Sequence, residues 1–279
     1  MNTMSIADAL QFGSQKLPPD HAKVEVEILL MQSLQMNRTY LYAHLQDSLS
    51  EKEFSKYQAL LEQRIQGCPV AYITGEKPFF TLSLEVNENV LIPRPETELL
   101  VDLSVAFLQQ QPSAHILDVG TGSGAIAIAI GMLFPSANID ASDISLQALQ
   151  VATRNCEKYQ LQNRLRLIHS DMFANITGTY NLIVSNPPYI PTSWLDSLPS
   201  DVKKEPRLAL DGGSDGLQVI ENLIRESRNH LAKNGLLLFE VCDGLSEKCN
   251  QKMENYGFHH CFIEDDLAGI HRICGGYYD

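Results

Sequence analysis

The chain has 279 residues, of which 44% are hydrophobic and 20% are charged, a composition typical of a soluble globular enzyme. Its 21 lysine and arginine residues face 34 aspartate and glutamate residues, so the formal net charge is −13 and the average surface repels a nucleic-acid backbone. The first residues lack a basic stretch followed by a long apolar run, and the apolar segment from Ala125 to Phe134 is far shorter than the roughly 20 residues of a membrane span. These features predict a cytoplasmic protein without a membrane segment.

The six cysteines include no Cys-x-x-Cys pair, which argues against a disulfide framework and against a zinc ribbon. Cys261, His271 and Cys274 lie near one another in the sequence, but their spacing does not match structural zinc sites. We therefore expect free thiols and no bound metal.

The first 75 residues predict a small helical bundle. Three segments carry helical patterns: SIADALQF, PPDHAKVEVEILLMQSLQ and SLSEKEFSKYQALLEQRIQG. In the third segment, Ser50 and Glu53 have the spacing of a capping box, and Gly67 supplies a stop signal. We place a first domain at residues 1–75.

A β-hairpin is predicted at residues 76–93. Apolar and polar residues alternate in KPFFTLSLEVNENVLIPRP on both sides of Asn87 and Asn89. We expect this hairpin to link two domains. Pro95 then begins a helix with acidic residues in its first turn, where negative charge suits the helix dipole.

From Ala114 onward, short β-rich runs alternate with amphipathic helical stretches. The runs are HILDVG, NIDASD, RLRLIHS, YNLIVSN and GLLLFEV. This alternation predicts βαβ units, and hence an α/β fold whose mostly parallel sheet is covered by helices on both faces. The last two runs, FHHCFIED and IHRICGGYY, have no long helix between them and predict an antiparallel pair. We place the second domain at residues 94–279.

Three glycines, Gly120, Gly122 and Gly124, directly follow the first of these strands and precede a helix. A glycine-rich turn at this position lets a ligand approach the backbone near the N-terminus of the helix. The spacing is G-x-G-x-G, which differs from the G-x-G-x-x-G of pyrophosphate binders, and Asp118 stands just before it. Asp143 ends the next strand, roughly 20 residues after the last glycine, where we expect it to bind ribose hydroxyls.

Asp171 follows the third strand, where it would reach an adenine amino group, with Met172 and Phe173 against the ring. Acidic residues at three successive strand ends, together with G-x-G-x-G, resemble the S-adenosylmethionine site of the seven-stranded methyltransferases. Their charge suits a cofactor that carries a sulfonium and an ammonium. The resemblance implies a Rossmann-like, seven-stranded class I methyltransferase domain. The cofactor contacts that we infer from it are Gly120, Thr121, Gly122, Ser123, Gly124, Asp143, Met172 and Asn186.

The fourth strand, NLIVSN, ends in Asn186, at the carboxyl end of a strand, where open α/β sheets place their chemistry. Because neither Pro187 nor Pro188 has an N–H group, the following turn offers carbonyl acceptors with few competing donors. The side-chain oxygen of Asn186 and the carbonyl of Pro187 would each accept one hydrogen of a planar NH2 group, on which Tyr189 would stack. The predicted catalytic and substrate-binding residues are Asn186, Pro187, Pro188 and Tyr189.

An amide or exocyclic amine is a poor nucleophile, because its lone pair is delocalised. Two fixed acceptors orient such a group and favour the positive charge that develops on nitrogen, so no strong base is needed before attack. The motif predicts methylation of a planar NH2 group and does not identify the substrate that carries this group.

Several longer segments resemble those of bacterial release-factor glutamine methyltransferases, and the resemblance covers essentially the whole chain. In order, they are VLIPRPETELLV, LDVGTGSGAIAIAI, SNPPYI, EPRLALDGGSDGL and DLAGIHRI. The resemblance implies methylation of the glutamine amide in the Gly-Gly-Gln loop of class I peptide chain release factors, which the N-terminal helices would bind. It also implies that Arg94 to Glu98 close over the pocket. After Glu240 the chain reads Val-Cys-Asp-Gly where the family often has x-Gly-x-x-Gln, so the resemblance assigns no role beyond Glu240.

Two other functions are compatible with the same motifs. A nucleic-acid adenine methyltransferase shares Asn-Pro-Pro-Tyr, but it would normally bring a basic face and a recognition domain, and residues 1–75 are not basic. A non-catalytic module that binds the cofactor or a translation factor would not need the intact motif. We therefore expect a release factor as protein partner, with no direct contact to nucleic acid or membrane.

Overall fold

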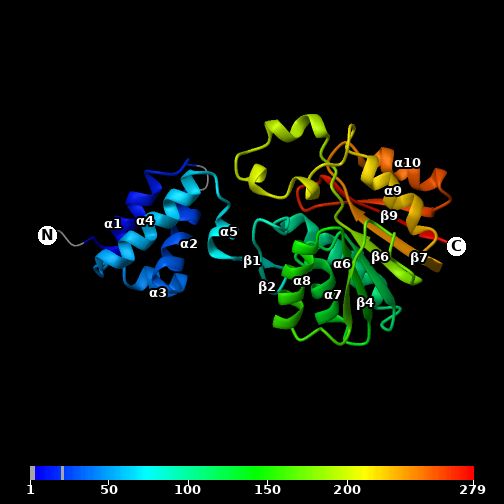
Figure 1. Ribbon diagram of the computed structural model, residues 1–279, viewed down its shortest axis with the longest axis horizontal. Coiled ribbons are helices and arrows are strands. Elements are labelled where there is room, and N and C mark those ends of the chain that lie inside the picture. The colour runs from blue at the N-terminus through cyan, green and yellow to red at the C-terminus, as the bar shows by residue number, and fades with distance from the viewer. Residues whose placement is uncertain (1–3, 20–21) are drawn as a thin grey trace. The chain divides into compact units, whose positions relative to one another are not determined.

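The structure is a computed structural model that describes residues 4–19 and 22–279. The chain divides into two units, drawn in Figure 1. The first comprises the chain up to Gly75 together with Pro199–Lys204, and the second comprises Glu76–Leu198 and Glu205–Asp279. Among the described residues, no helix is both long and apolar enough to cross a membrane.

The first unit is built from helices. They are α1 (Ile6–Ser14), α2 (Ala22–Leu34), α3 (Arg38–Ala43), α4 (Glu51–Ile65) and α5 (Val70–Thr74). The predicted capping box is present at α4, where the Ser50 hydroxyl accepts from the Glu53 amide and the Glu53 carboxylate accepts from the Ser50 amide. Residues 20 and 21, at the predicted start of the second helix, lie outside the described residues.

The segment Pro199–Lys204 completes the first unit, although it lies far along the chain. The Arg64 guanidinium donates to both carboxylate oxygens of Glu25, at 2.8 and 3.0 Å, and lies 3.6 Å from the Asp201 carboxylate. Ser200 lies against Gly67, where an added Cβ would approach within 3.3 Å, and Gly67 has φ +84°. The first unit is therefore discontinuous in sequence.

The predicted hairpin forms, but its turn lies earlier than expected. Strands β1 (Glu76–Phe79) and β2 (Leu82–Glu85) pair antiparallel and belong to the second unit. The turn uses Phe80, which has φ +54°, a conformation rare for an aromatic residue and therefore hard to predict. Asn87 and Asn89 lie beyond the hairpin, where the Asn87 side chain accepts the Asn89 amide at 3.0 Å and forms a local turn.

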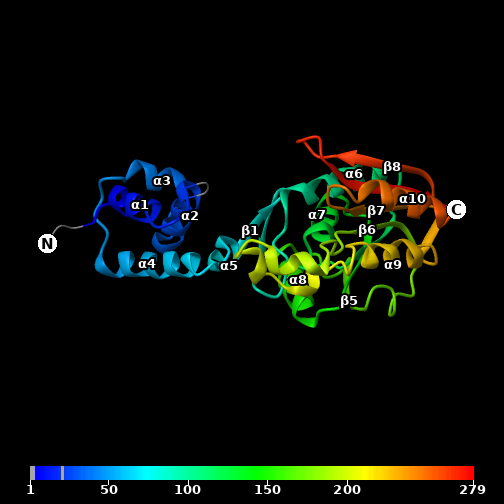
Figure 2. The same cartoon turned by 90° about the horizontal axis from the view of Figure 1, so that it is seen from above.

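The second unit contains a seven-stranded sheet, which Figures 1 and 2 show from two directions. Its strands are β3 (His115–Val119), β4 (Asn138–Asp143), β5 (Leu165–His169), β6 (Tyr180–Ser185), β7 (Leu231–Glu240), β8 (His259–Asp265) and β9 (His271–Tyr278). The spatial order is β5-β4-β3-β6-β7-β9-β8. Neighbouring strands are parallel from β5 to β7, and β9 is antiparallel to both β7 and β8. The predicted Rossmann-like fold and terminal antiparallel pair are confirmed.

Helices cover both faces of this sheet. They are α6 (Glu98–Leu108), α7 (Ala125–Leu133), α8 (Leu146–Lys158), α9 (Gln218–Ser227) and α10 (Ser246–Asn255). One core cluster contains apolar residues of α6, α7 and α8, and a second contains those of α9 and α10. Successive strand residues alternate between the clusters: Ile116 packs in the first and Leu117 in the second. Both faces of the sheet are buried under helices, which explains the nearly continuous apolar runs of the parallel strands.

Candidate active site

A cavity of about 460 Å³ lies at the carboxyl edge of the parallel strands. The loops that follow β3, β4, β5 and β6 all contribute to its wall. Further segments contribute to the wall: residues 88–91, Pro93, Thr97, residues 206–209, Asp211, Val219 and Asn222. Open parallel sheets place ligands at this edge, so the cavity is the candidate active site.

The glycine-rich loop after β3 is held by the end of β4. The amides of Gly120 and Thr121 both donate to the Ser142 carbonyl at 2.8 Å, and the Gly122 amide donates to the Asp143 carboxylate at 2.8 Å. A side chain at Gly120 or Gly122 would meet no protein atom within 4 Å, and both residues have positive φ. The loop thus leaves open space on the cavity wall.

Asp118 lies buried beneath this loop. One carboxylate oxygen accepts from the Thr121 hydroxyl at 2.7 Å, while Oδ1 has no partner within the part of the chain that the structure describes. Burial raises the pKa of Asp118 to about 7, opposed by the hydrogen bond from Thr121. Asp118 does not line the cavity, and it holds the loop through Thr121, which does.

Asp143 ends β4 and lines the cavity. Its two oxygens accept from the Ser145 amide at 2.9 Å and from the Gly122 amide at 2.8 Å. Burial raises its pKa, and these two backbone bonds act in the opposite direction. The remaining lone pairs of this fixed carboxylate fit ribose hydroxyls, as the sequence predicts.

The segment after β5 divides between the cavity and the core. Asp171 and Met172 line the cavity. Phe173, expected against an adenine ring, is buried in the core instead, with its ring stacked on His230 at a centroid distance of 5.0 Å. Met172 has φ +48°, which marks the bend at which the chain leaves the cavity wall.

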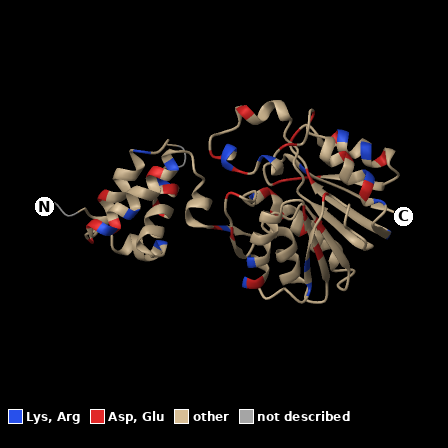
Figure 3. Cartoon of the chain, in the orientation of Figure 1, with Lys and Arg blue, Asp and Glu red and all other residues tan. Residues whose placement is uncertain are grey.

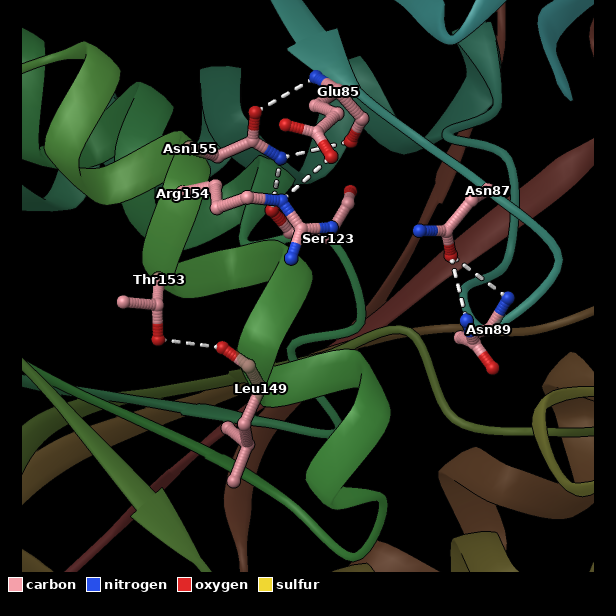
Figure 4. A network of polar contacts seen from close by, with 8 residues as sticks. All are labelled: Glu85, Asn87, Asn89, Ser123, Leu149, Thr153, Arg154 and Asn155. Atoms are coloured by element: carbon pink, nitrogen blue, oxygen red, sulfur yellow. Dashed lines mark hydrogen bonds and ion pairs between the residues drawn. The ribbon is translucent and has the colours of Figure 1, made fainter.

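A buried asparagine connects the glycine-rich loop to the hairpin. Asn155 accepts the Glu85 amide at 2.7 Å and donates from Nδ2 to the carbonyls of Glu85 and Ser123, each at 2.9 Å. We call Asn155 and these backbone groups of Glu85 and Ser123 the Asn155 cluster; Figure 4 shows it beside the exposed Arg154–Glu85 ion pair. Asn155 is fully buried, so it fixes the loop against α8 and β2.

A second buried cluster holds the Asn-Pro-Pro-Tyr motif. The Asn186 Nδ2 group donates to the Thr97 hydroxyl at 3.0 Å, which donates to Glu240 Oε2 at 2.6 Å. The Tyr189 hydroxyl donates to Glu240 Oε1 at 3.0 Å. We call these four residues the Glu240 cluster. Glu240 ends β7, and because Ser185 of β6 pairs with Phe239, Asn186 follows the sheet register to lie next to Glu240.

Most of the predicted site residues meet at the cavity. Those that line it are Gly120, Thr121, Gly122, Ser123, Asp143, Met172, Asn186 and Pro188. Gly124, Pro187 and Tyr189 do not line it. Gly124 caps α7 with φ +85°, and a Cβ there would come within 2.9 Å of Ile128. Pro187 is buried, and Tyr189 turns its hydroxyl to Glu240.

Sequence reasoning missed Thr97 and Glu240. Thr97 lies within the segment expected to close over the pocket, and it lines the cavity. Glu240 ends β7, as Asp143 ends β4, but no role was assigned to it from the sequence. An acidic residue that ends an otherwise apolar central strand was the signal that could have identified it.

Two segments of the cavity wall that are far apart in sequence are tied by a buried carboxylate. Glu205 accepts from the Ile92 amide at 3.1 Å and from the Arg94 guanidinium at 2.7 Å. Its side chain is buried, while that of Arg94 is partly exposed. A buried carboxylate depends on such hydrogen bonds, so these two bonds keep residues 88–97 and 205–209 together.

Comparisons with known proteins identify the family of the chain. The chain matches the family models described as PrmC N-terminal domain, over residues 8–75, and methyltransferase small domain, over residues 97–194. The release factor glutamine methyltransferase of Rhodopirellula baltica is 38% identical over 93% of this chain and 90% of that protein. The release factor glutamine methyltransferase of Coxiella burnetii is 37% identical over 97% of this chain and 98% of that protein.

Among solved structures, the catalytic domain of hMettl16 in complex with MAT2A 3'UTR hairpin 6 has a TM-score of 0.60. The match covers 79% of this chain and 82% of that chain, with 15% sequence identity. At this identity, the likeness concerns the fold alone.

Proposed function

We propose that this chain, which belongs to the release factor glutamine methyltransferase family, transfers a methyl group from S-adenosylmethionine to a glutamine side-chain amide of a peptide chain release factor. The glutamine would be that of the Gly-Gly-Gln loop of class I release factors. The chain spans nearly the full length of the relatives compared, which supports extending their activity to it.

One observation carries the proposal. Asn186 lines the cavity at the end of β6, and its Nδ2 group is engaged by the Thr97 hydroxyl, which leaves Oδ1 as the acceptor. Pro187 and Pro188 follow and contribute no N–H donor. An amide oxygen with no N–H donor beside it is the complement of an NH2 group.

The cavity residues fit the cofactor, which supplies an electrophilic methyl group on a sulfonium sulfur. Gly120 and Gly122 leave space for it, and Asp143 would accept its ribose hydroxyls. Two carboxylates line the cavity, those of Asp143 and Asp171, and negative charge there suits a positively charged cofactor.

The protein contributes orientation and electrostatic stabilisation to the chemistry. As the nitrogen–methyl bond forms and the sulfur–methyl bond breaks, positive charge moves to the amide nitrogen. Asn186 Oδ1, which lines the cavity, would stabilise that charge through one of the N–H hydrogens. One proton then leaves the nitrogen for water, directly or by way of this oxygen, so the product is a neutral secondary amide.

The helices of the first unit would bind the release factor. Their arginines form ion pairs within the unit: Arg38 donates to Glu27 at 2.9 Å, and Arg64 donates to Glu25 at 2.8 Å. Figure 3 shows Lys and Arg interspersed with Asp and Glu on these helices. Among the residues of this unit that the structure describes, the large hydrophobic side chains that are exposed are Val24, Tyr40, Tyr42 and Ile65. Mixed charge with exposed aromatic groups suits a protein partner better than a phosphate backbone.

The test is methyl transfer with radiolabelled S-adenosylmethionine. The acceptors are a purified class I release factor, the same factor with its loop glutamine changed to glutamate, and unmethylated DNA. We expect label on the unmodified release factor alone. Label on DNA alone would support methylation of an NH2 group and would refute the release factor as substrate. Cofactor binding without transfer to any acceptor would indicate a non-catalytic module.

A further inference from the structure

The Glu240 cluster joins three segments that are distant in sequence. Thr97 comes from the turn before α6, Asn186 and Tyr189 come from the loop after β6, and Glu240 comes from the end of β7. Thr97 is 4% exposed and Glu240 is 1% exposed. Buried carboxylates are costly unless their oxygens accept hydrogen bonds, and here each oxygen accepts one.

The hydrogens in this cluster can be assigned by counting donors. A threonine hydroxyl has one hydrogen, and an ionised carboxylate has none. At 2.6 Å from Glu240 Oε2, the Thr97 hydroxyl therefore gives its hydrogen to the carboxylate. Its oxygen can then only accept toward Asn186, at 3.0 Å. The group that Asn186 presents to Thr97 must be its NH2.

This assignment matters because the two ends of an asparagine amide have nearly the same shape. A rotation by 180° would fit the same space but would present NH2 in place of the oxygen to the substrate. Two NH2 groups facing each other repel, and neither would be satisfied. Packing cannot distinguish the two orientations. The Thr97 hydroxyl can, because its hydrogen is donated to Glu240 and its oxygen can only accept from Asn186.

We propose that Thr97 and Glu240 are positioning residues that fix the amide of Asn186 with its oxygen toward the acceptor nitrogen. This inference rests on the proposed function, in which that oxygen accepts a substrate hydrogen. Glu240 also accepts from Tyr189, so one carboxylate holds both ends of the Asn186–Tyr189 motif, directly at Tyr189 and through Thr97 at Asn186.

A pair of substitutions at one position separates hydrogen bonding from shape. Thr97→Val keeps the volume and removes the hydroxyl, and Thr97→Ser keeps the hydroxyl and removes the methyl group. The matched control is Thr153→Val, because the Thr153 hydroxyl donates to the Leu149 carbonyl of its own helix at 2.7 Å (Figure 4) and Thr153 does not line the cavity.

The experiment measures kcat and KM for methyl transfer to the release factor, cofactor affinity by calorimetry, and thermal unfolding for each variant. We expect Thr97→Val to lower kcat roughly 10- to 100-fold, the size expected for a misoriented contact, with cofactor affinity nearly unchanged. Thr97→Ser should restore most of kcat, and Thr153→Val should match the parent. A Thr97→Val enzyme with parental kcat, or a Thr97→Ser enzyme as slow as Thr97→Val, would overturn the inference.

A second readout does not depend on activity. In protein labelled with nitrogen-15 at asparagine, the side-chain NH2 signals of Asn186, assigned by their loss in Asn186→Asp, should exchange slowly with solvent and accelerate in Thr97→Val. Protected signals in an enzyme that methylates no release factor would overturn the proposed function and retain the positioning role. Signals unchanged by Thr97→Val in an active enzyme would overturn the positioning role alone.

Discussion

The Asn155 and Glu240 clusters both include residues of the cavity wall, and both connect segments distant in sequence, yet they use different kinds of partner. Asn155 bonds only backbone groups, of Glu85 and Ser123. The Glu240 carboxylate, by contrast, bonds the side chains of Thr97 and Tyr189, and the Thr97 hydroxyl in turn bonds Asn186. Backbone partners fix where a loop lies, whereas side-chain partners fix which atom a functional group presents. The first cluster should therefore govern stability and the second turnover.

The largest expected effect follows from removing the acceptor itself. Asn186→Ala should lower kcat by about 1000-fold, because it removes a group that stabilises charge on the reacting nitrogen. Cofactor affinity, measured by calorimetry, should fall far less than kcat, because Asn186 is one of several predicted cofactor contacts, and the melting temperature should change little. A variant that retains more than a tenth of parental kcat would refute the role of Asn186.

The next effect concerns the Asn155 cluster. Asn155→Ala should lower the free energy of unfolding by roughly 3 kcal/mol, because it leaves one buried amide and two carbonyls without partners and opens a small cavity. Urea denaturation provides the measurement. Asn155→Asp should be at least as damaging, since a carboxylate accepts from Glu85 but cannot donate to the two carbonyls. A loss of turnover without a loss of stability would contradict the contrast between the clusters.

A smaller effect is the pH dependence of turnover through Glu240. Burial raises the pKa of Glu240, and the nearby charge of Glu96 raises it further. Hydrogen bonds from Thr97 and Tyr189 and the positive charge of Arg272 lower this pKa in part. The ionised form of Glu240 is the one that accepts from Thr97. We therefore expect full kcat at pH values above this raised pKa, and a fall in kcat as the pH drops through it.

The Glu240→Gln variant isolates this titration from those of other carboxylates. A glutamine keeps the shape and one acceptor oxygen, so we expect kcat at neutral pH to fall only about tenfold. The difference between the acidic limbs of the two pH profiles reports Glu240. Identical limbs in the parent and the variant would show that another group titrates.

The smallest effect tests the exposed neighbour of the Asn155 cluster. Arg154 and Glu85 form an ion pair at 2.6 Å, with both side chains about 40% exposed. Arg154→Ala should change the free energy of unfolding by less than about 1 kcal/mol and leave kcat unchanged, because solvent screens exposed pairs. A larger loss would mean that this ion pair supports the contacts of Asn155.

Hydrophobic pattern was sufficient to predict the sheet, because apolar runs separated by amphipathic stretches report burial on both faces. The hairpin turn was placed at Asn87 and Asn89, residues that favour turns, whereas the chain turns at Phe80 in a conformation that its residue type disfavours. The strands β1 and β2 pair across this turn. A local propensity was overridden there by the surrounding packing.

The cavity wall was predicted best where a motif is local. Gly120, Asp143 and Asn186 stand out because each is defined by its neighbours in the sequence. Thr97 and Glu240 acquire their roles through a hydrogen bond that spans 143 positions, and no local pattern encodes such a contact. The same limit applies to Pro199–Lys204, which the sequence offers no reason to group with the N-terminal helices.

The discontinuity of the first unit has a consequence for how the chain is made. Asp201, which lies beside Arg64, is synthesised about 125 residues after Gly75, which at the usual pace of translation is a delay of roughly 6 to 25 s. During that interval the ribosome also delivers β3, β4, β5 and β6. The N-terminal helices therefore emerge first but are completed late, and a nascent chain released before residue 199 would carry an unfinished first unit.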